Sequence, residues 1–353
     1  MQDLGTHELA RLKQLIPSIG LFFTRLPLEK AFYIEDERRA ISKRRLVAPS
    51  FNDIRVILNT AQILELSKRF HRPQSSQLKL ITFDGDVTLY EDGKSMEHDS
   101  PIIPHLVSLL SQDVTIGVVT AAGYSDPSGL KYEERLHGLL AAVAKSPLLT
   151  SDQRENLFVM GGESNYLFRF NSEAGRLVFV PEEDWTLKSM REWAPHDVVA
   201  TLDFAESILR ELVEKLALPA QLIRKEKGVG IVPLKNHKIQ REQLEEVVLR
   251  CDKRLRAFPP AKRIRFCAFN GGSDVWVDIG DKSLGVQSLQ EFLSKKDPVG
   301  PANTLHVGDQ FAALGANDYK ARLSGCTVWV ANPGETNAML TDLLVYMSDW
   351  AKY

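Results

Sequence analysis

The sequence predicts an α/β fold whose core is a parallel sheet covered by helices on both faces. Short, continuous runs of Val, Ile and Leu occur at 78–83, 114–120, 304–308 and 327–330, and stretches with helical spacing separate them. A parallel sheet that is buried on both faces requires strands of that kind. Polar residues capable of chemistry follow directly after several of these runs, where the ligands of parallel sheets bind.

The length and composition indicate a globular protein. At 353 residues the chain is long enough for about two or three structural units. No apolar run approaches the roughly 18–20 residues of a membrane-spanning helix, and the N-terminus lacks the apolar stretch of a secretory signal. The three cysteines form no CxxC pair. We therefore expect a cytoplasmic protein with reduced thiols and no membrane partner.

Residues 1–76 are predicted to form an N-terminal helical segment. Apolar residues recur at helical spacing through 50–70, with Ser50 placed as an N-cap, and the polar stretch 71–77 is a connector. Residues 1–80 contain 14 Lys and Arg against 8 Asp and Glu, which fits an anionic ligand or an acidic partner. On charge alone a solvated helical face is the preferred interpretation. The excess is too small and scattered to predict nucleic-acid binding.

The middle of the chain mixes predicted strands with predicted helices and is predicted to be an α+β insertion between the second and third core strands. A β-hairpin is expected at 165–170 and 176–180, joined by a turn that contains Gly175. Further elements are expected as strands at 228–233, 263–269 and 274–279 and as helices at 195–216 and 238–256.

The segment Phe83-Asp84-Gly85-Asp86-Val87-Thr88 carries the main chemical signal. Two carboxylates two residues apart at a strand exit repel each other unless a cation lies between them. Asp84 is placed to attack phosphorus, and Asp86 to act as general acid and then general base. Mg²⁺ would bridge the nucleophile and the phosphate oxygens. The alternative interpretation is a simple turn, since Asp-Gly-Asp also suits turn geometry.

Three further residues strengthen the catalytic interpretation. Thr120 ends the second core strand, where its hydroxyl and the following amides can hold a phosphate oxygen. Lys282 follows the last strand of the insertion and can neutralise both phosphate and nucleophile. Asp309 follows a core strand and can complete an oxygen-rich Mg²⁺ site. Each signal is weak alone, but their order along one chain is unlikely to arise by chance.

That order resembles the four motifs of the haloacid dehalogenase superfamily. The resemblance implies a Rossmann-like core at 77–124 and 271–353 and an inserted α+β cap of the C2 type at 125–270. It also implies Mg²⁺ held by Asp84, Asp86 and Asp309. Familiar members carry an acidic pair about four residues after the last motif, whereas here Asn317-Asp318 comes later. The resemblance therefore leaves open which of these two residues supports the metal.

The segments FDGDVTLYEDG, VVTAAGY, GGSDVWVDIGDKSLGV and HVGDQFAALGANDYKAR, with the basic helical front, are similar to the fungal and apicomplexan IMP-specific 5'-nucleotidases. The likeness covers nearly the whole chain. It implies hydrolysis of inosine 5'-monophosphate (IMP), activation by ATP at a separate site, a homotetramer, and a regulatory or oligomerisation role for residues 1–76. The substrate contacts that it implies are Asp84, Asp86, Asp92, Thr120, Arg135, Asp274, Asp278 and Lys282.

Two other functions stay open at this stage. A sugar phosphomutase or phosphatase of the same superfamily would keep all four motifs and act on a sugar phosphate. A non-catalytic nucleotide sensor would use the basic front segment and an inert core, which the complete acidic set argues against. For the ATP site the sequence offers only charge-based candidates, namely Arg44, Arg45, His71 and Arg72.

Overall fold

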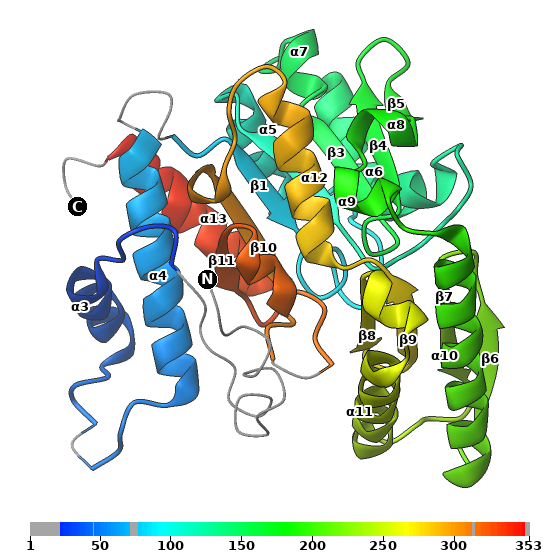
Figure 1. Cartoon of the computed structure of the whole chain (residues 1–353). Helices are drawn as coiled ribbons and strands as arrows, with labels where there is room; N and C mark the ends of the chain where they lie inside the picture. The colour runs from blue at the N-terminus through cyan, green and yellow to red at the C-terminus, as the bar shows by residue number, and fades with distance from the viewer. Residues whose placement is uncertain (1–21, 45, 71–76, 313–314, 350–353) are drawn as a thin grey trace, which may run out of the picture.

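The computed structural model describes residues 22–44, 46–70, 77–312 and 315–349. Arg45, His71 and Arg72, three of the charge-based candidates for the ATP site, lie outside these ranges. The described chain forms a large α/β unit with a smaller α+β unit at one end (Figure 1). No helix in the described ranges combines the length and the apolar character that crossing a membrane requires.

The large unit is built on a seven-stranded sheet in the order β11-β10-β1-β2-β3-β4-β5. The strands from β11 to β3 are parallel, and β4 and β5 extend the sheet in antiparallel fashion. The four predicted core strands are confirmed as β1, β2, β10 and β11. The bounds are β1 Leu80–Phe83, β2 Thr115–Val119, β3 Leu157–Gly161, β4 Tyr166–Asn171, β5 Arg176–Phe179, β10 Thr304–Gly308 and β11 Cys326–Trp329.

Helices cover both faces of this sheet because successive strand residues point to opposite sides. Ile81 packs into the cluster formed with α4, α5, α6 and α13, whereas Leu80 packs on the opposite face with α12 and Trp185 of α8. The helices of this unit are α3 Leu28–Arg39, α4 Phe51–Phe70, α5 Ile103–Ser111, α6 Leu130–Lys145, α7 Ser151–Arg154, α8 Glu182–Trp185, α9 Lys188–Arg191, α12 Lys282–Ser294 and α13 Pro333–Ser348, with 3₁₀ turns at Pro301–Asn303 and Tyr319–Leu323.

The small unit is a four-stranded antiparallel sheet, in the order β6-β7-β9-β8, packed against two helices. It has its own apolar core, in which Val229 and Val277 from the sheet meet Leu209 and Val247 from the helices. Its elements are β6 Ala220–Arg224, β7 Gly228–Pro233, β8 Phe266–Asn270, β9 Val275–Ile279, α10 Pro195–Lys215, α11 Arg241–Ala257 and a 3₁₀ turn at Pro260–Arg263.

The position of the predicted hairpin is wrong. Its two strands, β4 and β5, form as expected, but they join the large sheet beside β3 rather than the inserted unit. The sequence pattern does not predict the strand at 157–161, which is the strand that the hairpin pairs with. The inserted sheet therefore begins at β6 and continues to Ile279, so the expected cap at 125–270 includes core strands and stops short of β9.

Strand β9 faces the large unit with alternate residues. Val275 and Val277 point into the small unit's core, so Asp274, Trp276 and Asp278 lie on the other face. Glycines on the neighbouring strand β7 make room for them. A Cβ atom built on Gly228 would lie 2.0 Å from Oδ1 of Asp278, and one built on Gly230 would lie 2.5 Å from the indole of Trp276.

The helical front segment is confirmed where the structure describes it. Ser50 caps α4 as predicted, since its hydroxyl accepts a hydrogen bond from the amide of Asp53. Helix α4 is fixed to the large unit by Arg55, whose guanidinium donates to both carboxylate oxygens of Glu335 at 2.7 and 2.9 Å and to the carbonyl oxygen of Trp329. The front segment is thus attached to the last strand of the large sheet.

We predict that Arg55→Ala lowers the free energy of unfolding by about 2 kcal/mol, because it leaves a partly buried carboxylate and a carbonyl without their donor. The side chain of Arg55 is only 7% exposed, whereas that of Arg241, in its pair with Glu245, is 83% exposed. Urea unfolding of Arg55→Ala and of the control Arg241→Ala measures the difference in the free energy of unfolding. Equal stability of the two variants would contradict the prediction.

Candidate active site

Three of the predicted site residues lie side by side at one edge of the large sheet. Asp84, Thr120 and Asp309 each come directly after a strand, β1, β2 and β10 respectively. These strands are neighbours, with β1 in the middle, and all run in the same direction. Their carboxyl ends therefore bring the three side chains to one place, as the sequence predicted.

Lys282 lies at the centre of this group. It is the first residue of α12, and its side chain is completely buried. Its ammonium lies 2.8 Å from Oδ1 of Asp84 and donates to Oδ1 of Asp318 at 2.6 Å. The functional role of Lys282 is predicted from the sequence, but its complete burial is not. An unpaired buried ammonium is strongly destabilising, so the ion pairs with Asp84 and Asp318 are what allow Lys282 to be buried.

Asp318 is the acidic partner that the sequence left undecided. Its carboxylate accepts hydrogen bonds from Lys282, from Nε2 of His306 at 3.0 Å and from the amide of Gln310 at 2.9 Å. Burial by itself would raise the pKa of Asp318, but Lys282 and His306 outweigh it and lower that pKa to about 2. Asn317 points elsewhere, to Glu163 at 3.0 Å. Asp318 is therefore the member of the pair beside the nucleophile.

The donor set fits a divalent cation. Oxygen atoms of Asp84, Asp309 and Asp318 lie within 4.8 Å of one another. Oδ1 of Asp309 is buried and has no hydrogen-bond partner among the described residues, and burial next to Asp318 raises the pKa of Asp309 to about 7. Burial likewise raises the pKa of Asp84. Crowded, partly unsatisfied carboxylates are what a hard cation such as Mg²⁺ stabilises.

Asp86 lies outside this three-carboxylate group, although the resemblance implied that it holds the metal. Oδ1 of Asp86 accepts from the amide of Gly93 at 2.9 Å and lies 3.7 Å from the guanidinium of Arg135. Burial raises the pKa of Asp86. A carboxyl that is protonated more readily and lies beside the nucleophile suits a general acid better than a ligand. A metal contact from Asp86 stays a prediction.

The small unit contributes the remaining predicted contacts. Asp274 and Asp278 lie on the face of β9 that is turned to the large unit, and burial is the main cause that raises the pKa of each. Asp92 of the large unit lies near enough to Asp274 to contribute to that shift. A cleft of about 330 Å³ opens between the two units and is lined by Tyr124, Tyr166, Lys225 and Asp278, among others.

Sequence reasoning missed Glu163, which lies against this site. Its side chain is fully buried in the turn between β3 and β4, and one of its oxygens has no hydrogen-bond partner in the described chain. Burial raises the pKa of Glu163 to about 7. A polar residue just after an apolar strand was the signal that located Asp84 and Asp309. It failed for Glu163 because the strand Leu157–Gly161 was not recognised.

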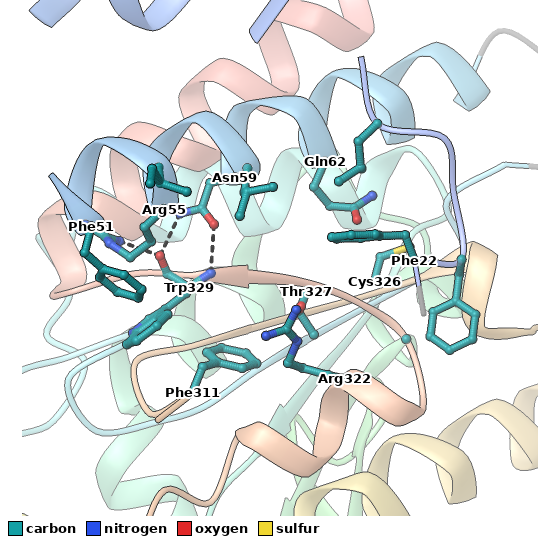
Figure 2. Close-up of a pocket in the computed structure, with 15 residues that line it drawn as sticks. Phe22, Phe51, Arg55, Asn59, Gln62, Phe311, Arg322, Cys326, Thr327 and Trp329 are labelled. Atoms are coloured by element: carbon teal, nitrogen blue, oxygen red, sulfur yellow. Dashed lines mark hydrogen bonds between the residues drawn. The ribbon is translucent and has the colours of Figure 1, made fainter. Parts of the chain in front are cut away.

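A second cavity, of about 140 Å³, lies where the front segment meets the large unit (Figure 2). Its walls include the aromatic rings of Phe51, Phe311 and Trp329, from α4, the loop after β10, and β11. Arg322 also lines it, half-buried, and no carboxylate among the described residues pairs with its guanidinium. The indole of Trp329 donates to the carbonyl oxygen of Asp309 at 2.7 Å, so the cavity adjoins the candidate metal site.

Residues 1–340 match the sequence profile of the family described as "IMP-specific 5'-nucleotidase". A relative of that name in Yarrowia lipolytica is 55% identical over 340 residues, which are 96% of this chain and 79% of the relative. The Saccharomyces cerevisiae relative is 51% identical over 360 residues, 97% of this chain and 80% of its own. This chain belongs to the IMP-specific 5'-nucleotidase family. It is accordingly an enzyme, a phosphoric monoester hydrolase.

Solved structures of the Plasmodium falciparum IMP-nucleotidase share the fold of this family member. An IMP-bound mutant of it is 39% identical to the chain, with a TM-score of 0.83 over 95% of this chain and 82% of that one. An ATP-bound form gives a TM-score of 0.79 at 39% identity, over 95% of this chain and 74% of that one. The predicted Rossmann-like haloacid dehalogenase fold is thus confirmed.

We predict that the metal-free protein loses stability between pH 6 and pH 8. Asp309 and Glu163 have pKa values near 7 when folded, against about 4 for acids of an unfolded chain. The folded state therefore holds more protons between these values, so its stability falls as pH rises. His306, whose pKa burial lowers, opposes this fall in part.

The measurement is the thermal midpoint in EDTA at both pH values, repeated with Mg²⁺. We expect a lower midpoint at pH 8, and a larger rise on adding Mg²⁺ at pH 8 than at pH 6, because the cation binds the ionised carboxylates of the folded state. Asp309→Asn should reduce the fall. A midpoint that is higher at pH 8 in EDTA would contradict the assignment.

Proposed function

We propose that the chain hydrolyses IMP to inosine and phosphate, with Mg²⁺ and an aspartyl-phosphate intermediate. The observation that carries this proposal is the buried ammonium of Lys282 between Asp84 and Asp318. That contact presents a carboxylate nucleophile beside a fixed positive charge at the carboxyl edge of a parallel sheet. Membership of the family, and the IMP-bound form of the Plasmodium relative, support IMP as the substrate.

In the first half-reaction Asp84 attacks phosphorus. Its Oδ1 is held by Lys282 and by the amide of Gly85 at 2.7 Å, which leaves Oδ2 as the attacking oxygen. The bond from phosphorus to the 5'-oxygen breaks, and Asp86 donates its proton to that oxygen as inosine leaves. The hydroxyl of Thr120 and the following amides hold a phosphate oxygen in the same site.

In the second half-reaction a water molecule attacks phosphorus and gives its proton to Asp86. The bond from phosphorus to Oδ2 of Asp84 breaks, which regenerates the free carboxylate beside Lys282 and releases phosphate. Mg²⁺, held by Asp84, Asp309 and Asp318, would supply positive charge against the phosphate oxygens. Lys282 contributes a second, fixed charge from the protein, on a side chain that is completely buried.

The inosine part fits the cleft between the two units. Its volume of about 330 Å³ is at the lower end of the range for small-molecule sites. Asp278 offers a buried acceptor for a ribose hydroxyl or a purine N–H, and Tyr124 and Tyr166 offer ring surfaces. Nothing in the described residues specifically favours a sugar phosphomutase or a non-catalytic sensor. A homotetramer and a cytoplasmic location stay predictions from the resemblance and the sequence.

We predict that Asp84→Asn lowers kcat for IMP by at least about a thousandfold, because an amide cannot form the acyl phosphate. Phosphate release measures the rate, and the thermal midpoint shows that the variant is folded. Asp99→Asn, on the exposed surface, is the matched control. Mg²⁺-dependent turnover near the wild-type rate in Asp84→Asn would exclude the nucleophile role.

Asp86→Asn is the companion variant. It keeps the nucleophile but loses the group that moves the proton, so both half-reactions should slow while acid-quenched protein still carries phosphate. Labelling from ³²P-IMP detects that phosphoenzyme. Label on Asp84→Asn as well as on Asp86→Asn would place the covalent phosphate elsewhere.

We propose further that ATP regulates this enzyme from the second cavity. The ATP-bound form of the Plasmodium relative supports ATP binding. Aromatic walls suit an adenine ring, and Arg322, which pairs with no carboxylate in the described ranges, offers a positive charge to a phosphate. Arg44, a charge-based candidate, is already bound to both oxygens of Asp53 at 2.9 and 3.0 Å. Through the bond from Trp329 to Asp309, a ligand in the cavity would act on the metal site.

We predict that ATP lowers the KM for IMP or raises kcat without being hydrolysed, and that Arg322→Ala raises the half-activating ATP concentration about tenfold. The assay follows inosine and ADP together at varied ATP. Basal activity without ATP should stay within about twofold. ADP formed in step with inosine would exclude an effector role. A loss of ATP response in Arg44→Ala but not in Arg322→Ala would place the ATP site near Arg44 instead of in the second cavity.

A further inference from the structure

The turn between β3 and β4, residues 162–165, has an uncommon backbone. Gly162, Glu163 and Ser164 have φ values of 63°, 53° and 80°, so three successive residues adopt the left-handed conformation. Glycine adopts it readily, but Glu and Ser do so only at a cost in conformational free energy. Such a conformation persists only where surrounding contacts impose it. The turn is therefore held by contacts that outweigh this cost.

Those contacts join the turn to the segment that leads into Lys282. The hydroxyl of Ser164 donates to the carbonyl oxygen of Asp281 at 2.7 Å, and the side-chain amide of Asn165 donates to the carbonyl oxygen of Ile279. Between them, a Cβ on Gly280 would lie 2.3 Å from the carbonyl oxygen of Glu163. The turn thus packs directly against the three residues that place Lys282 at the start of α12.

The side chain of Glu163 reaches the other flank of Lys282. Its Oε1 accepts from the side-chain amide of Asn317 at 3.0 Å, and Asn317 precedes Asp318, the residue that binds the ammonium at 2.6 Å. The backbone amide of Glu163 also donates to the carbonyl oxygen of Thr120 at 3.3 Å. One residue therefore contacts the loop after β2, the start of α12 and the loop that carries Asp318.

We propose that Glu163 is a positioning residue that orients Lys282 by holding Asn317, and with it Asp318, against the turn at 162–165. The proposal rests on the proposed aspartyl-phosphate mechanism, in which Lys282 stabilises the transition state. Glu163 is not among the described residues that line the cleft proposed for the nucleoside. Its effect passes through the hydrogen bond to Asn317, so it acts on the chemical step and not on binding of the nucleoside.

Four variants test the hydrogen bond from both sides: Glu163→Ala, Glu163→Gln, Asn317→Ala and the double variant Glu163→Ala with Asn317→Ala. The full-length protein is assayed with saturating Mg²⁺ on IMP and on p-nitrophenyl phosphate, and thermal midpoints show that each variant is folded. Glu173→Ala, in the exposed turn between β4 and β5, is the matched control.

We expect Glu163→Ala and Asn317→Ala each to lower kcat about tenfold or more, with KM for IMP changed less than about threefold. The loss should be equal for both substrates, because Lys282 acts on the phosphate. Glu163→Gln should keep at least about half of the wild-type kcat, since its amide oxygen accepts the same hydrogen bond. The double variant should be no slower than the slower single variant, because both remove one interaction.

The proposal is overturned by an unchanged kcat in Asn317→Ala, by a folded Glu163→Gln as slow as Glu163→Ala, or by single losses that multiply in the double variant. A loss confined to IMP would likewise overturn it and place Glu163 with the nucleoside. If Glu163→Ala does not fold, Asn317→Ala removes the same bond from the other side. Absence of Mg²⁺-dependent IMP hydrolysis in the wild type would refute the proposed function instead, which separates the two failures.

Discussion

The buried ammonium of Lys282 is the charge around which the site is organised. Taking a lysine fully out of water is strongly unfavourable unless carboxylates surround it. Asp84 and Asp318 meet that need at 2.8 and 2.6 Å, and Asp309 lies beside them. The acids outnumber the lysine, so the site still lacks positive charge. A divalent cation would supply that positive charge, which links the stability of the site to the proposed chemistry.

The same constraint explains how the two units are joined. Lys282 begins the helix that follows the last strand of the small unit, only a few residues after Asp278. Lys282, which belongs to the candidate active site of the large unit, therefore lies at the end of the segment that leads back from the small unit. Because Ser164 and Asn165 bind that segment, the edge of the large sheet fixes where the small unit ends. This arrangement keeps the face of β9 that carries Asp274 and Asp278 turned to the large unit.

The front segment is connected to the same site from the opposite side. Arg55 of α4 donates to the carbonyl oxygen of Trp329, and the indole of Trp329 donates to the carbonyl oxygen of Asp309. Two hydrogen bonds therefore lead from α4 to a candidate metal ligand. The cavity beside them, lined by Phe51 and Arg322, lies on that route. A regulatory role for the front segment has a physical basis in these contacts.

The sequence by itself determined the candidate catalytic residues and the strands that present them. Asp84, Thr120 and Asp309 follow short apolar runs, and a run of that kind in a parallel sheet fixes where its last side chain lies. Tertiary structure alone decided what depends on distant pairing. The sequence pattern of β4 and β5 is compatible with either sheet, because alternating apolar residues do not determine which strand a hairpin pairs with. Likewise, neither the burial of Lys282 nor the choice of Asp318 over Asn317 nor the place of Glu163 can be read from local pattern, because each depends on loops far apart in the chain.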